Sequence, residues 1–501
     1  MQHIDDFLDR ITMYRLVVYV LLAYVALAMV FAFMGKLSFS ATDMVLSLAL
    51  LLIPAFVVDK ACSYYFRAPT NSESWLITSL IMFLIIQPAD SIPTALALIT
   101  AGALSSASKF LFSWNNKHIF NPAALAAAVV SLTALQTTTW WIGNSSFWPF
   151  TLVLGFLIIR KIRMIPLFVA FIVASVGLQL LLLAIHQQPL VVAMKGALLA
   201  SPLLFLATIM LTEPATMPPR RNQQVIFAVL VAVLYVTAWG IGPFIVYPEV
   251  ALLLGNIYAF AVSPKFRVRL HLQEVQRISD KVYNYVFQPE RRFGFMPGQY
   301  MEWTLAGVPY DSRGNRRMFT IASSPTEDNV QIGVKYHSAA SAYKTTLWRL
   351  RPGDVIYASQ LAGNFTLDAN SSDKLAFIAG GIGITPFRSM VKYLVDNNLP
   401  CDIIILYVVP VTAELAYLQE FRAAQSLGVK LIPIVSNEKS PPPWVMNAKL
   451  DQRLITQLIP DASERLVYVS GPSGMVDATK RYLRNIGVAK ASIKTDHFTG
   501  Y

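Results

Sequence analysis

Cysteine is almost absent from this chain of 501 residues, which contains only Cys62 and Cys401. Two thiols cannot hold an iron–sulfur cluster, which needs four ligands, and they predict no disulfide framework. Histidine is also scarce, because between residues 14 and 262 only His118 and His186 occur. A membrane heme held by paired histidines inside helices is therefore not expected.

Charge is the second scarce property. Only 14% of the residues are charged and 55% are apolar, which is too apolar for an ordinary soluble protein. Long apolar stretches dominate up to about Val262, whereas the sequence from Pro264 onward is mixed and rich in turns. This change predicts a membrane domain followed by a soluble part. The first thirteen residues contain three aspartates and no small-residue cleavage site, so a removable signal peptide is not expected.

The remaining charge is unevenly placed. The net charge is +12, but the basic residues of the first half lie at the ends of apolar segments rather than in one patch, so no nucleic-acid partner is predicted.

Ten apolar segments lie near residues 14–34, 43–58, 75–86, 92–108, 120–135, 148–159, 165–185, 196–212, 224–240 and 248–262. The connectors on one side carry Arg10, Arg15, Lys60, Arg67, Lys109, Lys117, Arg160, Lys161, Arg163, Arg220 and Arg221. The other side carries Lys36 and Lys195. The positive-inside rule then predicts a multi-pass protein of a bacterial-type inner membrane, in contact with membrane lipid, with both termini cytoplasmic.

Proline marks these apolar segments at a repeated interval. Pro122 opens one segment and Pro248 opens another 126 residues later, and Gln87-Pro88 and Glu213-Pro214 close two segments at the same offset. Each proline alone is explained as ordinary helix punctuation. Two pairs at one offset predict two copies of five helices, and because five is odd the second copy is inverted. Inverted repeats with interrupted helices place ligands between the halves, near the midplane.

The same landmarks carry a family resemblance. KHIFNPAALA and LTEPATMPP resemble motifs of the homologous membrane flavoproteins that belong to the Na+-pumping NADH:quinone reductase and to the Rnf complex, across about residues 40–262. The resemblance implies an inverted five-helix repeat and a membrane flavin. That family attaches FMN to the threonine of an SGAT-like motif, which this chain lacks, so a non-covalent FMN or riboflavin is expected instead. The candidate residues are Asn121, Pro122, Thr212, Glu213, Pro214 and Thr216. The acids Asp90, Glu213 and Glu249 beside the breaks are either functional or simply at the interface.

The pattern of apolar and polar residues changes once within the soluble half. FRVRLHLQEV, from Phe266, alternates apolar and polar residues as half-buried strands do, and the following turns predict a small antiparallel β-barrel. After Asp373, continuous apolar runs such as LAFIAG and DIIILYVV alternate with helical stretches, which is typical of a parallel α/β sheet. The predicted domains are residues 1–262 (membrane), 263–372 (FAD-binding barrel) and 373–501 (nucleotide-binding α/β domain).

Four motifs lie in these two soluble domains. The first is RMFT, in which alternation sends Arg317 and Phe319 to one face of a strand. The second, LAFIAGGIGITPFRSM, places glycines between a strand and a helix whose amides can face a pyrophosphate, although it lacks the GxGxxG spacing. The third, YVSGPSGMV, is another strand that ends at a glycine and enters a helix, and the fourth is the terminal KTDHFTGY.

In this order the motifs resemble the ferredoxin–NADP+ reductase superfamily across about residues 264–501. The resemblance implies FAD and NAD(P)H as cofactors, with Arg317 at the FAD phosphates, Phe319 on the isoalloxazine ring and Thr320 near flavin N5. It further implies that Phe498 or Tyr501 stacks on the flavin, and that Ser470, where the family has cysteine, lies beside the nicotinamide with a catalytic role shared with Thr320. The helix opening for the pyrophosphate comprises Ser341, Ala342, Tyr343, Lys344 and Thr345. The nucleotide site comprises Gly380, Gly381, Gly383, Thr385, Gly471 and Pro472.

The sequence therefore predicts an FAD-dependent NAD(P)H oxidoreductase that passes electrons into its membrane domain, to a membrane flavin and then to a quinone or an extracytoplasmic acceptor, including a downstream redox protein. Glu438 after the strand-ending Ser436 would repel a 2′-phosphate, which favours NADH, although Lys439 follows it. Two alternatives stay open: a reductase of the ferric reductase or NADPH oxidase kind without heme, and a transporter that uses the reductase part as a redox sensor.

Overall fold

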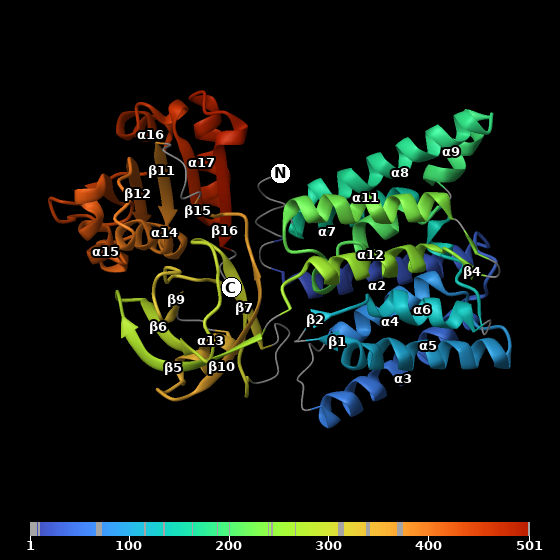
Figure 1. The fold of residues 1–501 in the computed structure, drawn as a ribbon. Helices are drawn as coiled ribbons and strands as arrows, with labels where there is room; N and C mark the ends of the chain where they lie inside the picture. The colour runs from blue at the N-terminus through green and yellow to red at the C-terminus, as the bar shows by residue number, and fades with distance from the viewer. Residues whose placement is uncertain are drawn as a thin grey trace. The chain divides into compact units, whose positions relative to one another are not determined.

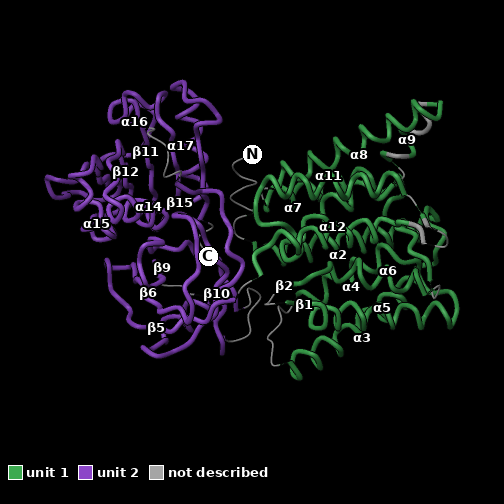
Figure 2. The backbone as a smooth tube through the Cα atoms, in the orientation of Figure 1, with its two compact units in different colours: residues 1–265, 310–314 green, residues 266–309, 315–501 purple. Residues whose placement is uncertain are grey.

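A computed structural model gives the fold in two compact units, which Figure 1 and Figure 2 show as ribbon and tube. Unit 1 comprises Met1–Lys265 and Tyr310–Gly314, and unit 2 comprises Phe266–Pro309 and Asn315–Tyr501. The structure describes residues 8, 11–66, 73–114, 117–133, 136–162, 164–187, 189–199, 201–238, 240–241, 244–265, 267–308, 315–336, 341–367 and 374–498. Tyr501 lies outside the described residues. The predicted domain boundaries stay predictions, and the division between the units falls three residues after the first of them.

Unit 1 is built from helices whose ends have clear local causes. Its main helices are α2 (Met13–Phe33), α3 (Ala41–Tyr65), α4 (Ser74–Ile85), α5 (Ile92–Leu111), α6 (Pro122–Leu132), α7 (Trp148–Ile162), α8 (Ile165–Ile185), α9 (Leu190–Leu199), α10 (Leu203–Phe205), α11 (Arg221–Thr237) and α12 (Pro248–Val262). Ser40 caps α3 by accepting a hydrogen bond from the Asp43 amide, and Asn121 caps α6 by accepting one from the Ala124 amide. Proline occupies the first turn of α6 and α12, where its missing N–H has no helical partner to lose.

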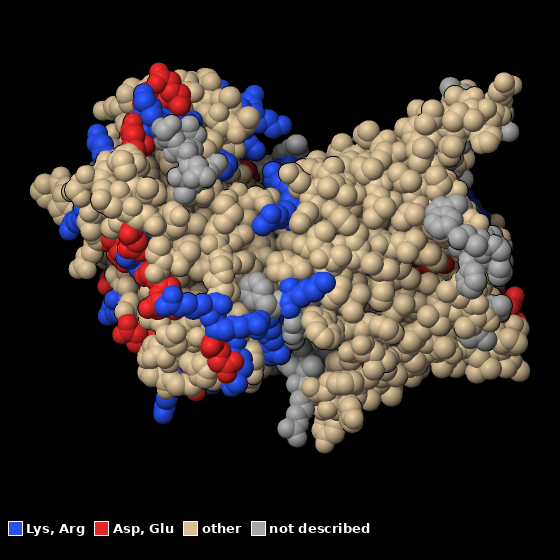
Figure 3. Space-filling model, viewed as in Figure 1, with Lys and Arg blue, Asp and Glu red and all other residues tan. Residues whose placement is uncertain are grey.

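Four of these helices are long and apolar enough to cross a membrane: α2, α3, α5 and α8. Helices α4, α6, α11 and α12 are shorter apolar helices. On the face shown in Figure 3, charged side chains gather over unit 2, while unit 1 is largely uncharged. Large apolar side chains of unit 1 such as Ile53 (64% exposed) and Val173 (65%) face outward. The predicted apolar helices are therefore present, and ten membrane crossings stay a prediction.

The eighth apolar segment, residues 196–212, is an interrupted helix rather than a continuous one. The chain forms α9, then α10, then the π-helical turn η2 (Leu206–Met210), and ends in the 3-10 turn η3 (Pro214–Thr216). Pro202 and Pro214 explain the interruptions, because proline cannot donate the hydrogen bond that continues a helix. π-turns inside helices are frequent at functional sites, so this break is a candidate position for chemistry.

The order of elements repeats within unit 1. Helix α5 is followed by the hairpin β1 (Ser113–Trp114) and β2 (Lys117–His118) and then by α6. Helix α11 is followed by the hairpin β3 (Gly240–Ile241) and β4 (Phe244–Ile245) and then by α12. The packing partners repeat as well, since α3 packs on α5 as α8 packs on α11, and α6 also packs on α12. The interval of 126 residues between Pro122 and Pro248 thus separates two matching local structures.

The first part of unit 2 is one curled antiparallel sheet. Its strands are β5 (Arg267–Arg277), β6 (Val282–Pro289), β7 (Tyr300–Thr304), β8 (Arg316–Thr320), β9 (Val330–Lys335) and β10 (Val355–Ala362), in the order β8-β7-β10-β5-β6-β9. The edge strands β8 and β9 approach each other but are not paired in that order. The predicted barrel is thus a curled open sheet, whose inner face buries residues such as Trp303 and Phe287.

The second part of unit 2 is a parallel six-stranded sheet with helices beside it. Its strands are β11 (Leu375–Gly380), β12 (Ile403–Val409), β13 (Val429–Val435), β14 (Met446–Asn447), β15 (Leu466–Pro472) and β16 (Ile493–Phe498), in the order β14-β13-β12-β11-β15-β16. The helices are α14 (Thr385–Asp396), α15 (Leu418–Ala423), α16 (Gln452–Leu458) and α17 (Ser473–Asn485). The predicted combination of an antiparallel sheet and a parallel α/β sheet is confirmed. The strands of a parallel sheet end at one edge, and that edge is the usual ligand edge.

Candidate active site

Strand β8 presents the RMFT motif beside a buried tyrosine. Arg317 and Phe319 share a face, as alternation predicts. The guanidinium carbon of Arg317 lies 5.0 Å from the ring centroid of Tyr343, and the Phe319 and Tyr343 rings are 5.9 Å apart. Met318 points the other way and is 53% exposed. An arginine and an aromatic ring on one face are the groups that a phosphate-bearing aromatic cofactor requires.

The predicted helix opening is α13 (Ala342–Trp348), and its side chains are already engaged. Ser341 accepts a hydrogen bond from the Lys344 amide at 3.3 Å, and the Thr345 amide donates to the Ser341 carbonyl at 2.9 Å. The Lys344 ammonium donates to the Lys335 carbonyl at 2.8 Å. Tyr343 lies in the core of the sheet, where its hydroxyl donates to the Trp303 carbonyl at 3.1 Å. The start of α13 can therefore bind a phosphate through its backbone N–H groups and not through the Tyr343 side chain.

The glycine motifs meet at the carboxyl edge of the parallel sheet. Strands β11 and β15 are neighbours, with Ala379 opposite Ser470. A Cβ atom at Gly383 would lie 2.5 Å from the Ser470 carbonyl oxygen, and one at Gly380 would lie 2.3 Å from the Met475 sulfur. Gly381 has φ +55°, in the left-handed region that favours glycine. The close backbone approach thus requires glycine at Gly383, and the left-handed backbone favours glycine at Gly381.

Two hydroxyl groups lie in this edge. The Thr385 hydroxyl, at the first turn of α14, donates to the Ile382 carbonyl at 3.1 Å. The Ser470 hydroxyl is fully buried and has no hydrogen-bond partner among the described residues. Buried polar groups are normally satisfied, so the Ser470 hydroxyl fits a site where a bound polar molecule completes the bonding. Pro472 is exposed at the end of β15.

The sequence reasoning missed an acid beside this edge. In the terminal motif only Phe498 or Tyr501 is expected to contribute, but Ile493–Phe498 form β16, in which Asp496 lies opposite Ser470 and Phe498 opposite Pro472. Burial raises the pKa of the Asp496 carboxyl to about 6. Burial and the neighbouring Asp496 together raise the pKa of the Tyr300 hydroxyl, and Tyr300 lies opposite Thr320 in the ladder of β7 and β8. The segment IKTDHF carries no alternating pattern that would have indicated a strand.

A second missed group is Glu414, which joins the two sheets of unit 2. Its carboxylate contacts the Lys281 ammonium at 2.8 Å and the Lys335 ammonium at 2.7 Å. Although burial raises the pKa of the Glu414 carboxyl, the two lysines lower it below its usual value. The Lys335 ammonium also lies 3.9 Å from the position of a Cβ atom at Gly381. This lysine is therefore a cation beside the glycine loop.

Glu438 is held at the end of β13. One of its carboxylate oxygens accepts hydrogen bonds from the Thr412 amide at 2.6 Å and from the Thr412 hydroxyl at 2.7 Å. These hydrogen bonds lower the pKa of the Glu438 carboxyl. The group is thus a fixed negative charge after a parallel strand, at the edge where nucleotides bind.

The membrane-domain candidates come together at the helix break of unit 1. The Asn121 amide N–H donates to Asn256 Oδ1 at 2.9 Å, and the Asn256 side chain donates to the Thr216 carbonyl at 3.5 Å. The Thr216 hydroxyl donates to a carboxylate oxygen of Glu213 at 3.1 Å. Pro122 and Pro214 start the turns that bear these groups. Asn256, on α12, was missed because it lies inside an apolar run.

Thr212 stands apart from this cluster. Its hydroxyl donates to the Thr208 carbonyl at 2.9 Å, within its own helical turn. Glu249, named beside the other break, is buried and accepts hydrogen bonds from the Thr138 hydroxyl at 2.5 Å and from Trp140 Nε1 at 2.8 Å. Asp90 is exposed. Glu249 therefore bonds residues of the first half directly, whereas Glu213 is connected to the first half through Thr216, Asn256 and Asn121.

The part of the chain that forms unit 2 is similar to several known proteins. Residues 377–481 match the family model of the oxidoreductase NAD-binding domain. The chain is 27% identical over 203 residues to an NADPH oxidoreductase of Mycobacterium tuberculosis (39% of this chain, 50% of that protein) and 25% identical over 199 residues to the NADH oxidoreductase HCR of Escherichia coli (40% and 58%). Among solved structures, the flavohem-like FAD/NAD binding domain of nitric oxide dioxygenase from Vibrio cholerae covers 46% of this chain and 98% of its own, at 20% identity and a TM-score of 0.42.

These relatives define the class of the C-terminal part. It is an FAD- and NAD(P)H-dependent oxidoreductase module of the ferredoxin–NADP+ reductase type. The chain spans about half the length of the curated relatives that it matches. The activity of the whole protein is therefore a separate question.

Proposed function

We propose that the protein is a membrane-bound oxidoreductase that takes electrons from cytosolic NADH at unit 2 and passes them through FAD into unit 1. The observation that carries the proposal is the convergence, in one unit, of the RMFT strand with its paired strand β7, the glycine edge and the Asp496 carboxyl. Only residues 263–266 separate the first strand of this unit, β5, from the last apolar helix, α12, which favours electron transfer within one polypeptide.

The residues of unit 2 have distinct roles in this proposal. Arg317 and the opening of α13 would hold the FAD pyrophosphate, Phe319 and an aromatic residue of the chain end (Phe498 or Tyr501) would pack on the ring, and the Thr320 hydroxyl would bond the flavin edge. Gly380, Gly381, Gly383, Thr385, Gly471 and Pro472 would line the nucleotide site, with the unsatisfied Ser470 hydroxyl beside the nicotinamide. The flavin, when bound, supplies the conversion of a hydride into single electrons. Asp496 would exchange the accompanying proton, because its pKa lies near neutrality.

Unit 1 would receive the electrons. Its exposed apolar side chains and the four long apolar helices suit contact with lipid. The hydrocarbon core is about 30 Å thick, so electron transfer to the far surface needs an intermediate carrier or a quinone dissolved in the bilayer. The Asn121–Asn256–Thr216–Glu213 cluster lies at the meeting of the repeated halves, where the family resemblance implies an inverted repeat. We propose it as the polar wall of a non-covalent flavin or quinone site.

The central experiment combines flavin extraction with turnover. Acid extraction of the purified full chain is expected to release FAD and one further flavin, and NADH is expected to be consumed catalytically with an added quinone. Release of FAD alone would support direct quinone reduction. One round of reduction without turnover would contradict the enzyme and support the redox-sensing transporter, which the repeated halves of unit 1 would also allow.

The fixed charge of Glu438 predicts the choice of nucleotide. The substitution Glu438→Gln keeps an oxygen acceptor for Thr412 but removes the charge that would repel a 2′-phosphate. We expect kcat/KM for NADPH to rise about tenfold, equivalent to about 1.4 kcal/mol, with little change for NADH. Steady-state kinetics with both nucleotides would measure this. The exposed Glu464→Gln, which leaves the edge intact, serves as control, and an unchanged NADPH preference would contradict a role for Glu438.

The break in unit 1 gives a prediction that separates the two units. The substitution Glu213→Gln should lower NADH:quinone turnover about tenfold while leaving NADH:ferricyanide turnover unchanged, because ferricyanide can take electrons from the reductase module in water. Asp90→Asn, an exposed acid beside the other break, is the matched control. Equal loss with both acceptors would place the defect in folding or in unit 2 instead.

A further inference from the structure

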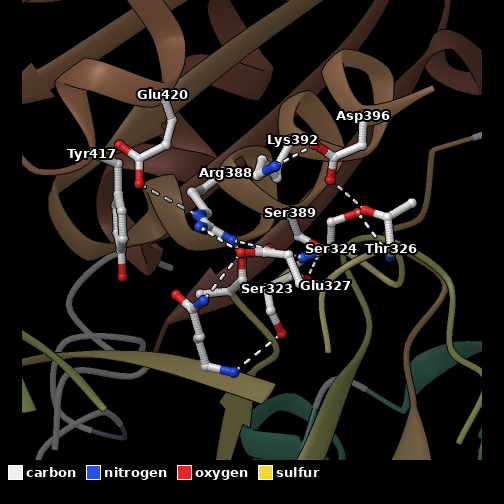
Figure 4. A network of polar contacts seen from close by, with 12 residues as sticks. Ser323, Ser324, Thr326, Glu327, Arg388, Ser389, Lys392, Asp396, Tyr417 and Glu420 are labelled. Atoms are coloured by element: carbon white, nitrogen blue, oxygen red, sulfur yellow. Dashed lines mark hydrogen bonds and ion pairs between the residues drawn. The ribbon is translucent and has the colours of Figure 1, made fainter. Parts of the chain in front are cut away.

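The glycine loop and the RMFT strand are joined by a dense polar contact. The glycine loop, which would hold the nucleotide, runs directly into α14. Strand β8, which would hold the flavin, is followed by the segment 322–327, and this segment lies beside α14 (Figure 4). The labelled side chains in that view come from the segment after β8, from α14 and from the region of α15.

Arg388, on the first turns of α14, lies at the centre of this contact. Its guanidinium Nη2 donates to Glu327 Oε1 at 3.0 Å, its Nη1 contacts Glu327 Oε2, and Nη1 also donates to the Ala322 carbonyl at 3.2 Å. The Arg388 side chain is 6% exposed. A second carboxylate, from Glu420 on α15, lies 3.6 Å from its Nε. The arginine therefore ties α14 to the chain that leaves the RMFT strand.

Glu327 is equally well held. Its Oε2 accepts a hydrogen bond from the Ser324 amide at 2.6 Å, and its Oε1 accepts one from the Gln331 side chain at 3.1 Å. Both carboxylate oxygens thus have partners on the flavin side as well as on Arg388. A bidentate arginine–carboxylate pair fixes direction as well as distance.

Neighbouring contacts leave little freedom for sliding. The Ser389 hydroxyl donates to the Ser323 carbonyl at 2.6 Å. On β9, a Cβ atom at Gly333 would lie 2.8 Å from Thr385 Cγ2 and 2.4 Å from the Tyr417 hydroxyl. The absence of a side chain at Gly333 therefore lets the start of α14 approach the curled sheet closely.

We propose that the Arg388–Glu327 pair is a positioning element, which sets the spacing between the nucleotide loop and the flavin strand for hydride transfer. The inference rests on the proposed function of the reductase module. In that step the C4–H bond of the dihydronicotinamide breaks and a bond to flavin N5 forms, so NADH is oxidised by two electrons and FAD is reduced by the same two. A displacement of about 1 Å between reacting groups can cost about 100-fold in rate, whereas a buried ion pair contributes little net stability over a neutral replacement.

The test uses the full-length protein and a neutral double variant. Arg388→Gln combined with Glu327→Gln removes both charges together and leaves hydrogen-bonding groups. We expect the single-turnover rate of flavin reduction by NADH to fall 10- to 100-fold. The Kd for NAD+ should change less than twofold, the FAD content should stay at the level of the unsubstituted protein, and the charge-transfer absorbance of reduced FAD with NAD+ should weaken. Arg388→Lys keeps the charge but loses the bidentate contact. Its rate of flavin reduction should lie between the rates of the double variant and of the unsubstituted protein.

Lys392→Gln is the matched control. Lys392 lies one turn further along α14 in the Lys392–Asp396 contact and is 31% exposed, so its removal should leave the rate and the charge-transfer absorbance unchanged. A double variant that reduces flavin at the unsubstituted rate would overturn the proposal. So would loss of FAD or of thermal stability in both the double variant and Arg388→Lys, because the pair would then be purely structural. Absence of flavin reduction in the unsubstituted protein would instead refute the proposed function.

Discussion

Gly383→Val is expected to reduce kcat/KM for NADH by at least about 100-fold while FAD remains bound. A Cβ atom at this position would lie 2.5 Å from the Ser470 carbonyl oxygen, so β15 and the loop after β11 must separate. The separation displaces the Ser470 hydroxyl and the loop amides that face the nucleotide, and misplacement of about 1 Å is enough for a loss of this size. Stopped-flow flavin reduction over a range of NADH concentrations would measure it.

Gly474→Ala is the control for the glycine prediction. Nothing lies within 4 Å of a Cβ atom at Gly474, in the first turn of α17, so alanine should leave turnover unchanged and should not lower stability. If Gly383→Val kept the full rate of flavin reduction, the glycine edge could not be the nucleotide site. If Gly383→Val lost FAD together with activity, the effect would instead be a general loss of folding.

Asp496→Asn should lower turnover about 100-fold, in the usual range for a lost acid–base group. Oxidation of a bound reduced flavin would release a proton, and the ionised Asp496 carboxylate is the form that would accept it. Because the pKa of Asp496 is about 6, turnover of the unsubstituted protein should rise as pH increases through 6. The asparagine variant should lack this rise. Profiles of kcat between pH 5 and 8 would measure it.

The same carboxyl predicts a change in stability with a definite sign. Burial raises the folded pKa of Asp496 above its unfolded value, so its stabilising contribution is complete below about pH 4 and is lost as pH rises through 6. Asp496→Asn should therefore weaken the dependence of the free energy of unfolding on pH in this window. Asp280→Asn, an exposed acid on the curled sheet, is the control. A rise of kcat near pH 6 that survives in Asp496→Asn would exclude Asp496 as its source.

The sequence predicted those parts of the molecule in which local pattern decides structure. Alternation located β5, the continuous apolar runs located β11 and β12, and glycine followed by Pro386 located the start of α14. Local pattern could not show which strands lie side by side, so the pairing of Ser470 with Asp496 and the two lysines of Glu414 were missed. Asn256 was missed for a related reason, because one polar residue in an apolar helix gains meaning only from its partner, Asn121.

Whether the antiparallel strands close into a barrel could not be predicted without the tertiary structure. Short alternating strands separated by turns are compatible with a closed barrel or an open sheet, because closure depends on the pairing of the edge strands. The eighth segment of unit 1 shows a similar limit, since its overall hydropathy does not reveal the π turn at Leu206–Met210. In both cases the elements were predictable and their exact continuity was not.

The π turn η2 has a consequence for the symmetry of unit 1. In the described residues the corresponding helix of the first copy, α4, is regular to Ile85, whereas the second copy widens at Leu206–Met210 before Glu213. Two identical walls would accept an elongated guest either way round with equal energy. Unequal walls remove that degeneracy, so a guest of the proposed site would bind in one orientation.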